Sequence, residues 1–247
     1  MTDVSNKTVL LTGALGSLGR AQAQSFVAAG ADLILLDRPD HPEAQAFTRL
    51  LGERAIYVGQ DLGKLHEAEE AVRGLAGLRG GIDVLINNAA LIINKPFESF
   101  SLEEYEDQIR VNSSAAFALT RAVAPGMKAK RAGKIVNFCS VTLNGQWDGY
   151  VPYVASKGAL LGLTKSLARE LGPFGICVNA ISPGAVVSDS ETRVFGDRAQ
   201  EYSDWVLTHQ CLKRRIEPQA IADLVLFLAS TVSDMITGQN IACDGGW

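Results

Sequence analysis

Residues 8–19 read TVLLTGALGSLG, an aliphatic run followed directly by a glycine-rich loop that opens a helical pattern. Glycines permit a tight turn and close approach of the backbone, while the amides and dipole at a helix start attract phosphate. A glycine-rich loop alone can be an ordinary turn, so its place between a strand and a helix carries the prediction of a dinucleotide site. The residues expected to contact the cofactor there are Gly13, Gly16, Ser17, Leu18 and Gly19.

Similar aliphatic runs recur along the chain, with longer helical patterns between them. The seven expected strands are residues 8–11, 32–36, 55–58, 84–87, 134–138, 177–181 and 239–242. Because these runs are apolar throughout instead of alternating, they are typical of a parallel sheet covered by helices on both faces. Helices are expected at residues 17–29, 65–74, 102–127, 151–171 and 218–229. The pattern therefore predicts a doubly wound α/β fold with a seven-stranded parallel sheet.

The chain of 247 residues contains no long linker rich in Pro, Gly or Ser, so we expect one domain. Residues 187–213 are polar, lack a clear period and include Trp205 and His209. A loop of that length inside a compact domain is usually functional. We therefore predict a lid over the substrate in this segment.

Charge and composition exclude several classes of partner. A net charge of −4 disfavours binding to nucleic acid or to an anionic membrane surface. No apolar run reaches the roughly 18 residues that span a bilayer, and residues 1–7 lack a signal pattern. The four cysteines form no close pair, which is typical of reduced thiols in a cytoplasmic protein.

A metal site is not predicted. His41, His66 and His209 lie far apart in the sequence and show no ligand spacing with the cysteines, which argues against a zinc alcohol dehydrogenase.

The second expected strand is followed by Asp37 and Arg38. A carboxylate there can accept hydrogen bonds from both adenosine ribose hydroxyls and repels a 2′-phosphate, so NAD is predicted in preference to NADP. Arg38 favours the alternative, because a guanidinium can pair with the extra phosphate. Asp37 can also be read simply as a turn residue at the end of a strand.

Five separated motifs together resemble the short-chain dehydrogenase/reductase family across essentially the whole chain. They are the loop 12–19, Asp61-Leu62, Asn87-Asn88-Ala89-Ala90, Ser140 with Tyr153-Val-Ala-Ser-Lys157, and Pro183-Gly184. The resemblance implies a Rossmann-type fold and NAD(P)-dependent hydride transfer between an alcohol and a carbonyl compound. Two departures from the family pattern are Ser17 and Ala90, each of which stands where a glycine is usual. Ser17 leaves the loop length unchanged but puts the local backbone path in doubt.

The resemblance also implies further cofactor contacts. Asp61 and Leu62 would flank the adenine, Asn88, Ala89 and Ala90 would line the adenosine side, and Val186 and Ser188 would meet the nicotinamide portion. Taken singly, each of these residues can equally be structural.

Tyr153 and Lys157 are four residues apart and so lie on one helix face. A free phenol has a pKa of about 10, so we expect the Lys157 ammonium to stabilise the phenolate that acts as the base. By resemblance, Lys157 also holds the nicotinamide ribose, Ser140 polarises the substrate oxygen, and Asn112 holds a water that links Lys157 to solvent. The alternative to a catalytic role is a structural one, in which all four residues only make local hydrogen bonds.

The expected reaction interconverts a secondary alcohol and its carbonyl compound. Cyclic and aromatic alcohols are among the candidate substrates. Substrate recognition is expected from residues 91–94, 142–150 and 187–213. Rival functions are an NADP-dependent carbonyl reductase of the 3-oxoacyl reductase type and a non-catalytic NAD-binding redox sensor, although sensors typically lose the Tyr or the Lys.

The resemblance further implies a homotetramer. Its subunits would pair through the helices at residues 102–127 and 151–171, and Trp247 would lie in an interface or near a neighbour's active site. Nucleotide-sugar epimerases and dehydratases resemble the family too, but their chains are longer.

Overall fold

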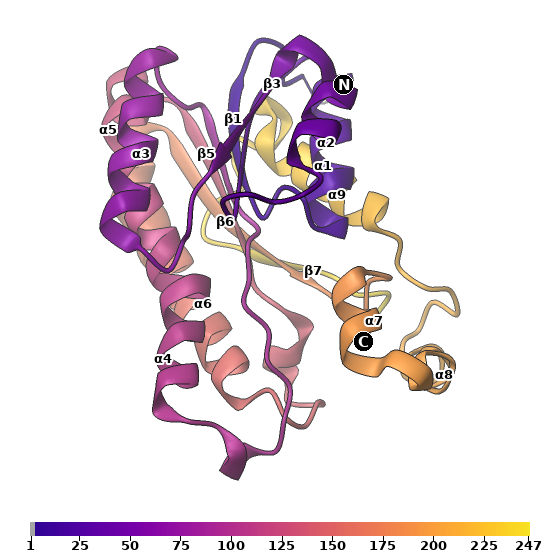
Figure 1. Cartoon of the computed structure of the whole chain (residues 1–247). Helices are drawn as coiled ribbons and strands as arrows, with labels where there is room; N and C mark the ends of the chain where they lie inside the picture. The colour runs from indigo at the N-terminus through magenta and orange to yellow at the C-terminus, as the bar shows by residue number, and fades with distance from the viewer. Residues whose placement is uncertain (1–2) are drawn as a thin grey trace.

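The computed structural model describes residues 3–247, which form a parallel sheet of seven strands between two layers of helices (Figure 1). The strand order is β3-β2-β1-β4-β5-β6-β7. The strands are β1 Thr8–Thr12, β2 Asp32–Asp37, β3 Ala55–Gly59, β4 Val84–Asn87, β5 Gly133–Phe138, β6 Ile176–Pro183 and β7 Asn240–Cys243. All seven predicted strands and the doubly wound fold are confirmed.

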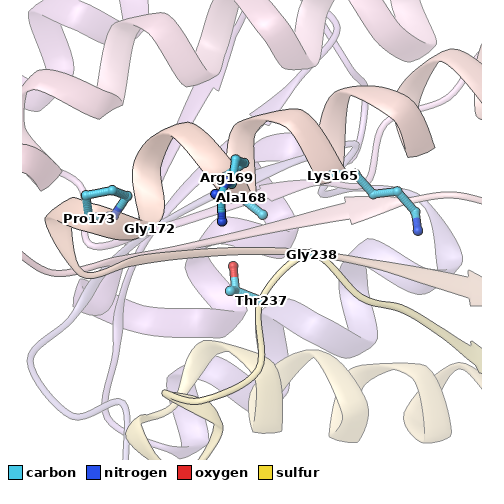
Figure 2. A pocket seen from close by; sticks show the side chains of 7 residues that line it. All are labelled: Lys165, Ala168, Arg169, Gly172, Pro173, Thr237 and Gly238. Carbon is cyan, nitrogen blue, oxygen red and sulfur yellow. The ribbon is translucent and has the colours of Figure 1, made fainter.

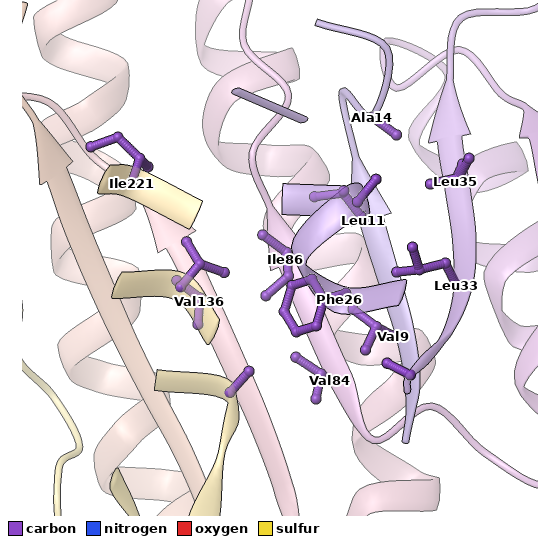
Figure 3. Packing of buried hydrophobic residues seen from close by; sticks show 14 of the residues in the cluster. Val9, Leu11, Ala14, Phe26, Leu33, Leu35, Val84, Ile86, Val136 and Ile221 are labelled. Atoms are coloured by element: carbon purple, nitrogen blue, oxygen red, sulfur yellow. The ribbon is translucent and has the colours of Figure 1, made fainter. Parts of the chain in front are cut away.

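Successive residues of each central strand enter different cores, which explains why the strands are apolar throughout. Val9 and Leu11 of β1 pack against α1 (Ser17–Ala28), α2 (Ala44–Leu51) and α9 (Pro218–Ala229). Leu10 points to the opposite face, where α3 (Leu65–Leu78), α5 (Ala115–Lys130) and α6 (Val151–Leu171) cover the sheet. Figure 3 shows the first core, with Phe26 of α1 beside the side chains of the central strands.

The chain reverses direction across the sheet between β1 and β4, which are neighbours. The segment after β1 leads into α1 on one face, whereas the segment after β4 leads to helices on the other face. The two connections therefore diverge at the carboxyl ends of these strands, which is where open α/β sheets bind ligands.

The helix predicted over residues 102–127 is interrupted. It consists of α4 (Leu102–Ile109), a π-helical turn at Arg110–Ser114, and α5. The hydrophobic period continues through the turn, so the sequence pattern did not reveal the interruption. Single π-helical turns inside α-helices occur frequently at functional sites, and this one contains Asn112.

The segment predicted as a polar loop, residues 187–213, is largely helical. It contains α7 (Asp189–Phe195) and α8 (Ala199–His209). The prediction failed because α8 buries Val206 alone, so its apolar face is formed mainly by aromatic residues spaced as Tyr202, Trp205 and His209. The short helix α2 was also missed, although Phe47 and Leu51 bury one face of it.

Among residues 3–247, no helix is long and apolar enough to cross a membrane. Within the same range, no group of three or more His, Cys, Asp or Glu side chains is placed to hold a metal ion. All four cysteines are free; Cys139 and Cys177 are buried, and Cys211 is exposed.

Candidate active site

The glycine-rich loop fits tightly against its neighbours at two positions. Gly13 has φ of +62°, and a Cβ there would lie 2.8 Å from the Cα of Ala89. A Cβ on Gly19, in the first turn of α1, would lie 2.2 Å from the carbonyl oxygen of Gly13. Gly16 is open, since its nearest neighbour would be 3.7 Å away. Glycine is therefore required sterically at both ends of the loop but not at its middle.

The N-terminus of α1 offers free amides to an anion. Its N-cap is Gly16, which makes no side-chain capping bond, and its first turn contains no acidic residue. Uncapped amides at a helix N-terminus, with the positive end of the dipole, form a ready site for phosphate. Ser17 is the first residue of the helix, so the departure from the family pattern leaves this geometry intact.

Asn88 and Thr12 hold the loop against the end of β4. The Thr12 hydroxyl oxygen accepts the backbone N–H groups of Asn88 and Ala89, each at 3.0 Å. The Asn88 amide donates to the carbonyls of Thr12 at 2.9 Å and Gly13 at 3.0 Å, and its oxygen accepts from Gln22 at 3.0 Å. The Asn88 side chain therefore positions the loop, while the nearby Ala90 is exposed.

Asp37 lies at the end of β2 with its carboxylate turned toward the loop. One oxygen accepts the N–H of Leu15 at 2.8 Å and the other accepts the N–H of Arg38 at 2.8 Å. The carboxylate stands next to the phosphate-binding loop, as expected of a ribose ligand.

The other two predicted adenosine contacts differ in exposure. Asp61 is exposed and accepts the N–H of Gly63 at 2.8 Å in the turn before α3. Leu62 is only 8% exposed and packs into the core, so its backbone is the part left to reach an adenine.

Asn112, in the π-helical turn, is 2% exposed and its side chain is fully occupied. Its oxygen accepts the N–H of Leu91 at 2.7 Å, and its nitrogen donates to the Leu91 carbonyl and to the Ser156 hydroxyl, each at 2.9 Å. Ser156 in turn donates to the carbonyl of Tyr153 at 2.6 Å. The Asn112 side chain thus fixes the loop after β4 and the start of α6.

Ser140, Tyr153 and Lys157 meet beyond the end of β5. Ser140 accepts hydrogen bonds from the N–H of Thr142 at 3.2 Å and from its hydroxyl at 2.9 Å. A hydrogen bond with Ser140 also reaches the Tyr153 hydroxyl and lowers its pKa. Lys157, one helical turn further along α6, donates to the carbonyl of Phe138 at 2.6 Å. Its ammonium lies 5.4 Å from the centre of the Tyr153 ring. Three residues of the predicted tetrad, Ser140, Tyr153 and Lys157, are therefore brought together.

Burial controls the protonation of this group. Despite the bond to Ser140, burial raises the pKa of Tyr153 to about 12. Burial also lowers the pKa of Lys157 to about 8. The direction for Tyr153 is opposite to the expected one, because burial of the phenol outweighs the hydrogen bond with Ser140, while the Lys157 ammonium is hydrogen-bonded to the Phe138 carbonyl.

The segment after β6 contains the last predicted cofactor residues. Val186 is 6% exposed and bridges to Ile216. The Ser188 hydroxyl caps α7 by accepting the N–H of Glu191 at 3.3 Å. Ser-x-x-Glu is a helix-start signal that could have revealed α7 in the sequence.

An aromatic lid cluster, formed by Trp147, Tyr202, Trp205, His209 and Trp247, lies beside the catalytic group. The rings of Trp147 and Trp247 stack at 4.6 Å, and Trp205 lies 5.2 Å from Trp247. The indole N–H of Trp247 donates to Gln146 at 2.6 Å. Trp247 therefore packs on its own chain, an arrangement that the sequence did not predict.

Glu191 and Arg215, which sequence reasoning did not identify, lie beside the aromatic lid cluster, with the Arg215 guanidinium 5.9 Å from the centre of the Tyr202 ring. Their ion pair measures 2.5 Å, with side chains 14% and 16% exposed. Burial, with a contribution from the Glu191 carboxylate, raises the pKa of Tyr150, whose ring centre lies 6.0 Å from that of Tyr153. A nearly buried carboxylate thus lies close enough to Tyr150 to affect its pKa.

A surface pocket lies elsewhere, between the end of α6 and the turn before β7 (Figure 2). It is lined by Lys165, Ala168, Arg169, Gly172, Pro173, Thr237 and Gly238. None of the predicted catalytic or cofactor residues lines it, so it is separate from the candidate active site.

Comparisons with known proteins find similar sequences over nearly the whole chain. The family model described as enoyl-(acyl carrier protein) reductase matches residues 13–247. D-Xylose 1-dehydrogenase of Caulobacter vibrioides is 32% identical over 246 residues, covering 99% of this chain and 96% of the relative. 3-Oxoacyl-[acyl-carrier-protein] reductase of Staphylococcus epidermidis is 33% identical over 244 residues, covering 98% of each.

A solved structure agrees over the whole fold. It is a candidate NAD(P)-dependent gluconate 5-dehydrogenase of Beutenbergia cavernae with NADP bound at low occupancy. It superimposes with a TM-score of 0.91 at 33% identity, covering 100% of this chain and 98% of that one. With this match over nearly its whole length, the chain belongs to the short-chain dehydrogenase/reductase family, as an NAD(P)-dependent oxidoreductase of CH–OH groups.

Proposed function

We propose that the protein is an NAD-dependent dehydrogenase that converts a secondary hydroxyl group of a small polyhydroxylated substrate into a carbonyl. The observation that carries this proposal is the meeting of the Ser140 and Tyr153 hydroxyls above a buried Lys157. Two of the similar proteins are named for xylose and gluconate, which supports a sugar or sugar acid as the substrate class.

The chain has a cradle that fits the cofactor. Gly13 and Gly19 leave room only for a bare backbone, and the uncapped start of α1 faces the same loop. This loop would hold the pyrophosphate, Asp37 the adenosine ribose, and Lys157 the nicotinamide ribose. Asp61, Leu62, Asn88 to Ala90, Val186 and Ser188 would line the rest of the site. When bound, the oxidised nicotinamide supplies the acceptor for a hydride from the alcohol carbon.

In the proposed reaction, Ser140 holds the substrate oxygen and Tyr153 accepts its proton. A phenol with a pKa of about 12 is almost entirely protonated near neutral pH, so a positive charge nearby is needed to stabilise the phenolate. Lys157 provides that charge, and its own pKa of about 8 allows it to take up and release a proton near neutral pH. Lys157 therefore acts as the relay between Tyr153 and solvent, and a water held by Asn112 would link Lys157 to the solvent.

The preference for NAD rests on Asp37. A 2′-phosphate on the adenosine ribose would meet a carboxylate whose two oxygens are already fixed by backbone N–H groups. Arg38 keeps NADP as the second candidate, because its side chain is exposed next to Asp37 and the similar solved structure contains NADP. An NADP-dependent carbonyl reductase of the 3-oxoacyl type is the corresponding alternative function.

We also propose that the protein is a cytoplasmic homotetramer. Large apolar side chains are exposed on the helices expected to pair, with Leu102 at 82% and Phe117 at 47%. Residues 12–19 would form the cofactor loop, residues 140–157 the catalytic segment and residues 187–213 the substrate lid of one domain.

The proposal is tested by following absorbance of the reduced nicotinamide with purified protein and NAD or NADP. The panel contains pentoses, hexonates, and cyclic and aromatic alcohols, with an acetoacetyl thioester assayed in the reducing direction. Turnover of a sugar or sugar acid with NAD that is lost in Tyr153→Phe supports the proposal. Turnover of the thioester with NADP alone would favour the second candidate, and tight NAD binding without any turnover would favour a redox sensor.

A further inference from the structure

The N-termini of α1 and α7 meet through a pair of hydrogen bonds. The Ser17 hydroxyl donates to the Asp189 carboxylate at 2.8 Å and accepts the backbone N–H of Asp189 at 3.0 Å. The two residues are 172 positions apart in the sequence. The lid helix is thus attached directly to the helix that starts the predicted phosphate site.

This contact places a carboxylate where the proposed function needs a phosphate. The first turn of α1 has no acidic residue of its own, so Asp189 supplies the negative charge there. A carboxylate is favourable at a helix N-terminus for the same reason that a phosphate is. A phosphate bound at the start of α1 and the Asp189 carboxylate would repel each other, because like charges repel at close range. The two anions would therefore compete for this position.

Nearby cations are engaged elsewhere. Arg20 pairs with Glu43 at 2.5 Å, and Arg215 pairs with Glu191 at 2.5 Å. Arg193 donates to the backbone carbonyl of Asp189 at 3.4 Å, which leaves the carboxylate without that guanidinium. Among residues 3–247, none of the ion pairs includes Asp189. The exposed Asp189 carboxylate is therefore free to compete as a charge.

We propose that Asp189 is an affinity-setting residue that competes with the cofactor's pyrophosphate for the N-terminus of α1. The inference rests on the proposed function, because it assumes that a dinucleotide binds at this loop. Binding would displace Asp189 and detach α7 from Ser17. Because Glu191 lies on α7 and pairs with Arg215 beside the aromatic lid cluster, cofactor binding would be coupled to the position of the substrate lid.

The test measures NADH affinity by isothermal titration calorimetry in wild type and in Asp189→Asn. The asparagine keeps an acceptor and a donor for Ser17 but removes the charge. We expect NADH to bind roughly two- to fivefold more tightly, the size of one solvent-exposed charge at a helix N-terminus. The gain should shrink at high salt, where exposed charges are screened.

Asp223→Asn is the matched control. Asp223 is also exposed and also accepts one side-chain hydrogen bond, from Gln219 at 2.7 Å, but it lies on α9. Its substitution should leave the dissociation constant unchanged, and thermal unfolding of all three proteins should agree.

The outcomes separate the two proposals. If wild type binds neither NADH nor NAD, the proposed function itself fails. If wild type binds NADH but the folded Asp189→Asn variant binds equally or more weakly, the proposed function stands and the competition by Asp189 is refuted.

Discussion

Lys157 donates a 2.6 Å hydrogen bond to the backbone carbonyl of Phe138, with its side chain 1% exposed. A buried ammonium destabilises the folded protein, since removing a charge from water costs several kcal/mol and its hydrogen-bond partners seldom offset that cost. The fold nevertheless retains it 5.4 Å from the centre of the Tyr153 ring, the proposed acid/base. The residue is therefore better explained by chemistry than by stability, and the two can be separated by experiment.

Replacing Lys157 by Met should reduce turnover without destabilising the protein. Met fills a similar volume and removes the buried charge, so the free energy of unfolding should be unchanged or higher. The turnover number should fall about 100-fold or more, the contribution expected of an acid/base relay. Lys165→Met, an exposed position two turns along α6, should change neither quantity. A large loss of stability in Lys157→Met would mean that the hydrogen bond from Lys157 to the Phe138 carbonyl stabilises the fold.

The same residue should make stability depend on pH above neutrality. Its pKa is lowered to about 8 in the folded protein from 10.5, so between these values the unfolded chain binds more protons and stability rises with pH. The difference in unfolding free energy between wild type and Lys157→Met should therefore change by about 2 to 3 kcal/mol from pH 7 to pH 10, in favour of wild type. Urea unfolding at a series of pH values measures it, and a constant difference would show that Lys157 is not perturbed.

Alanine should have a small effect on stability at Gly16 and a large destabilising effect at Gly19, although both glycines belong to the same loop. Gly16→Ala adds a methyl group with its nearest neighbour at 3.7 Å, at a residue with φ of −76°, so stability should change by less than about 1 kcal/mol. Gly19→Ala forces a contact of 2.2 Å with the Gly13 carbonyl, so it should cost about 3 kcal/mol or prevent folding. Chemical unfolding of both variants measures the contrast, which equal effects would contradict.

Removing the ring of Trp247 should weaken substrate binding more than cofactor binding. Trp247→Ala deletes the stack with Trp147, an interaction of about 0.5 to 1.5 kcal/mol, so the KM for the alcohol should rise roughly two- to tenfold. The KM for NAD should stay constant, and Trp247→Phe should retain most of the affinity. A change in both KM values together would instead indicate that the terminus supports the fold as a whole.

Much of the fold could be predicted because its signals are local. An aliphatic run such as residues 8–11 predicts a buried strand, and the glycine-rich loop after it predicts which end of the sheet carries the site. Tyr153, Lys157 and Ser140 could be identified because their spacing resembles that of a known family. The meeting of these side chains in the structure depends on neighbouring strands and helices, which the motif order already implies.

Other features depend on contacts between distant segments. The aromatic face of α8 packs against Trp147 and Trp247, which are distant in the sequence, so the residues of α8 looked like a polar loop. The pKa of Tyr153 follows from burial, which no spacing of residues expresses. The contact between Ser17 and Asp189 joins residues 172 positions apart in the sequence and had no local signal.

The aromatic lid cluster has an optical consequence. The sequence contains three tryptophans, and the cluster includes all of them: Trp147, Trp205 and Trp247. Indole emission from the unmodified protein therefore originates in a single corner of the molecule, beside the catalytic group. A shift in its wavelength or intensity would report the opening and closing of that corner in real time, with no dye attached and no background from the sheet.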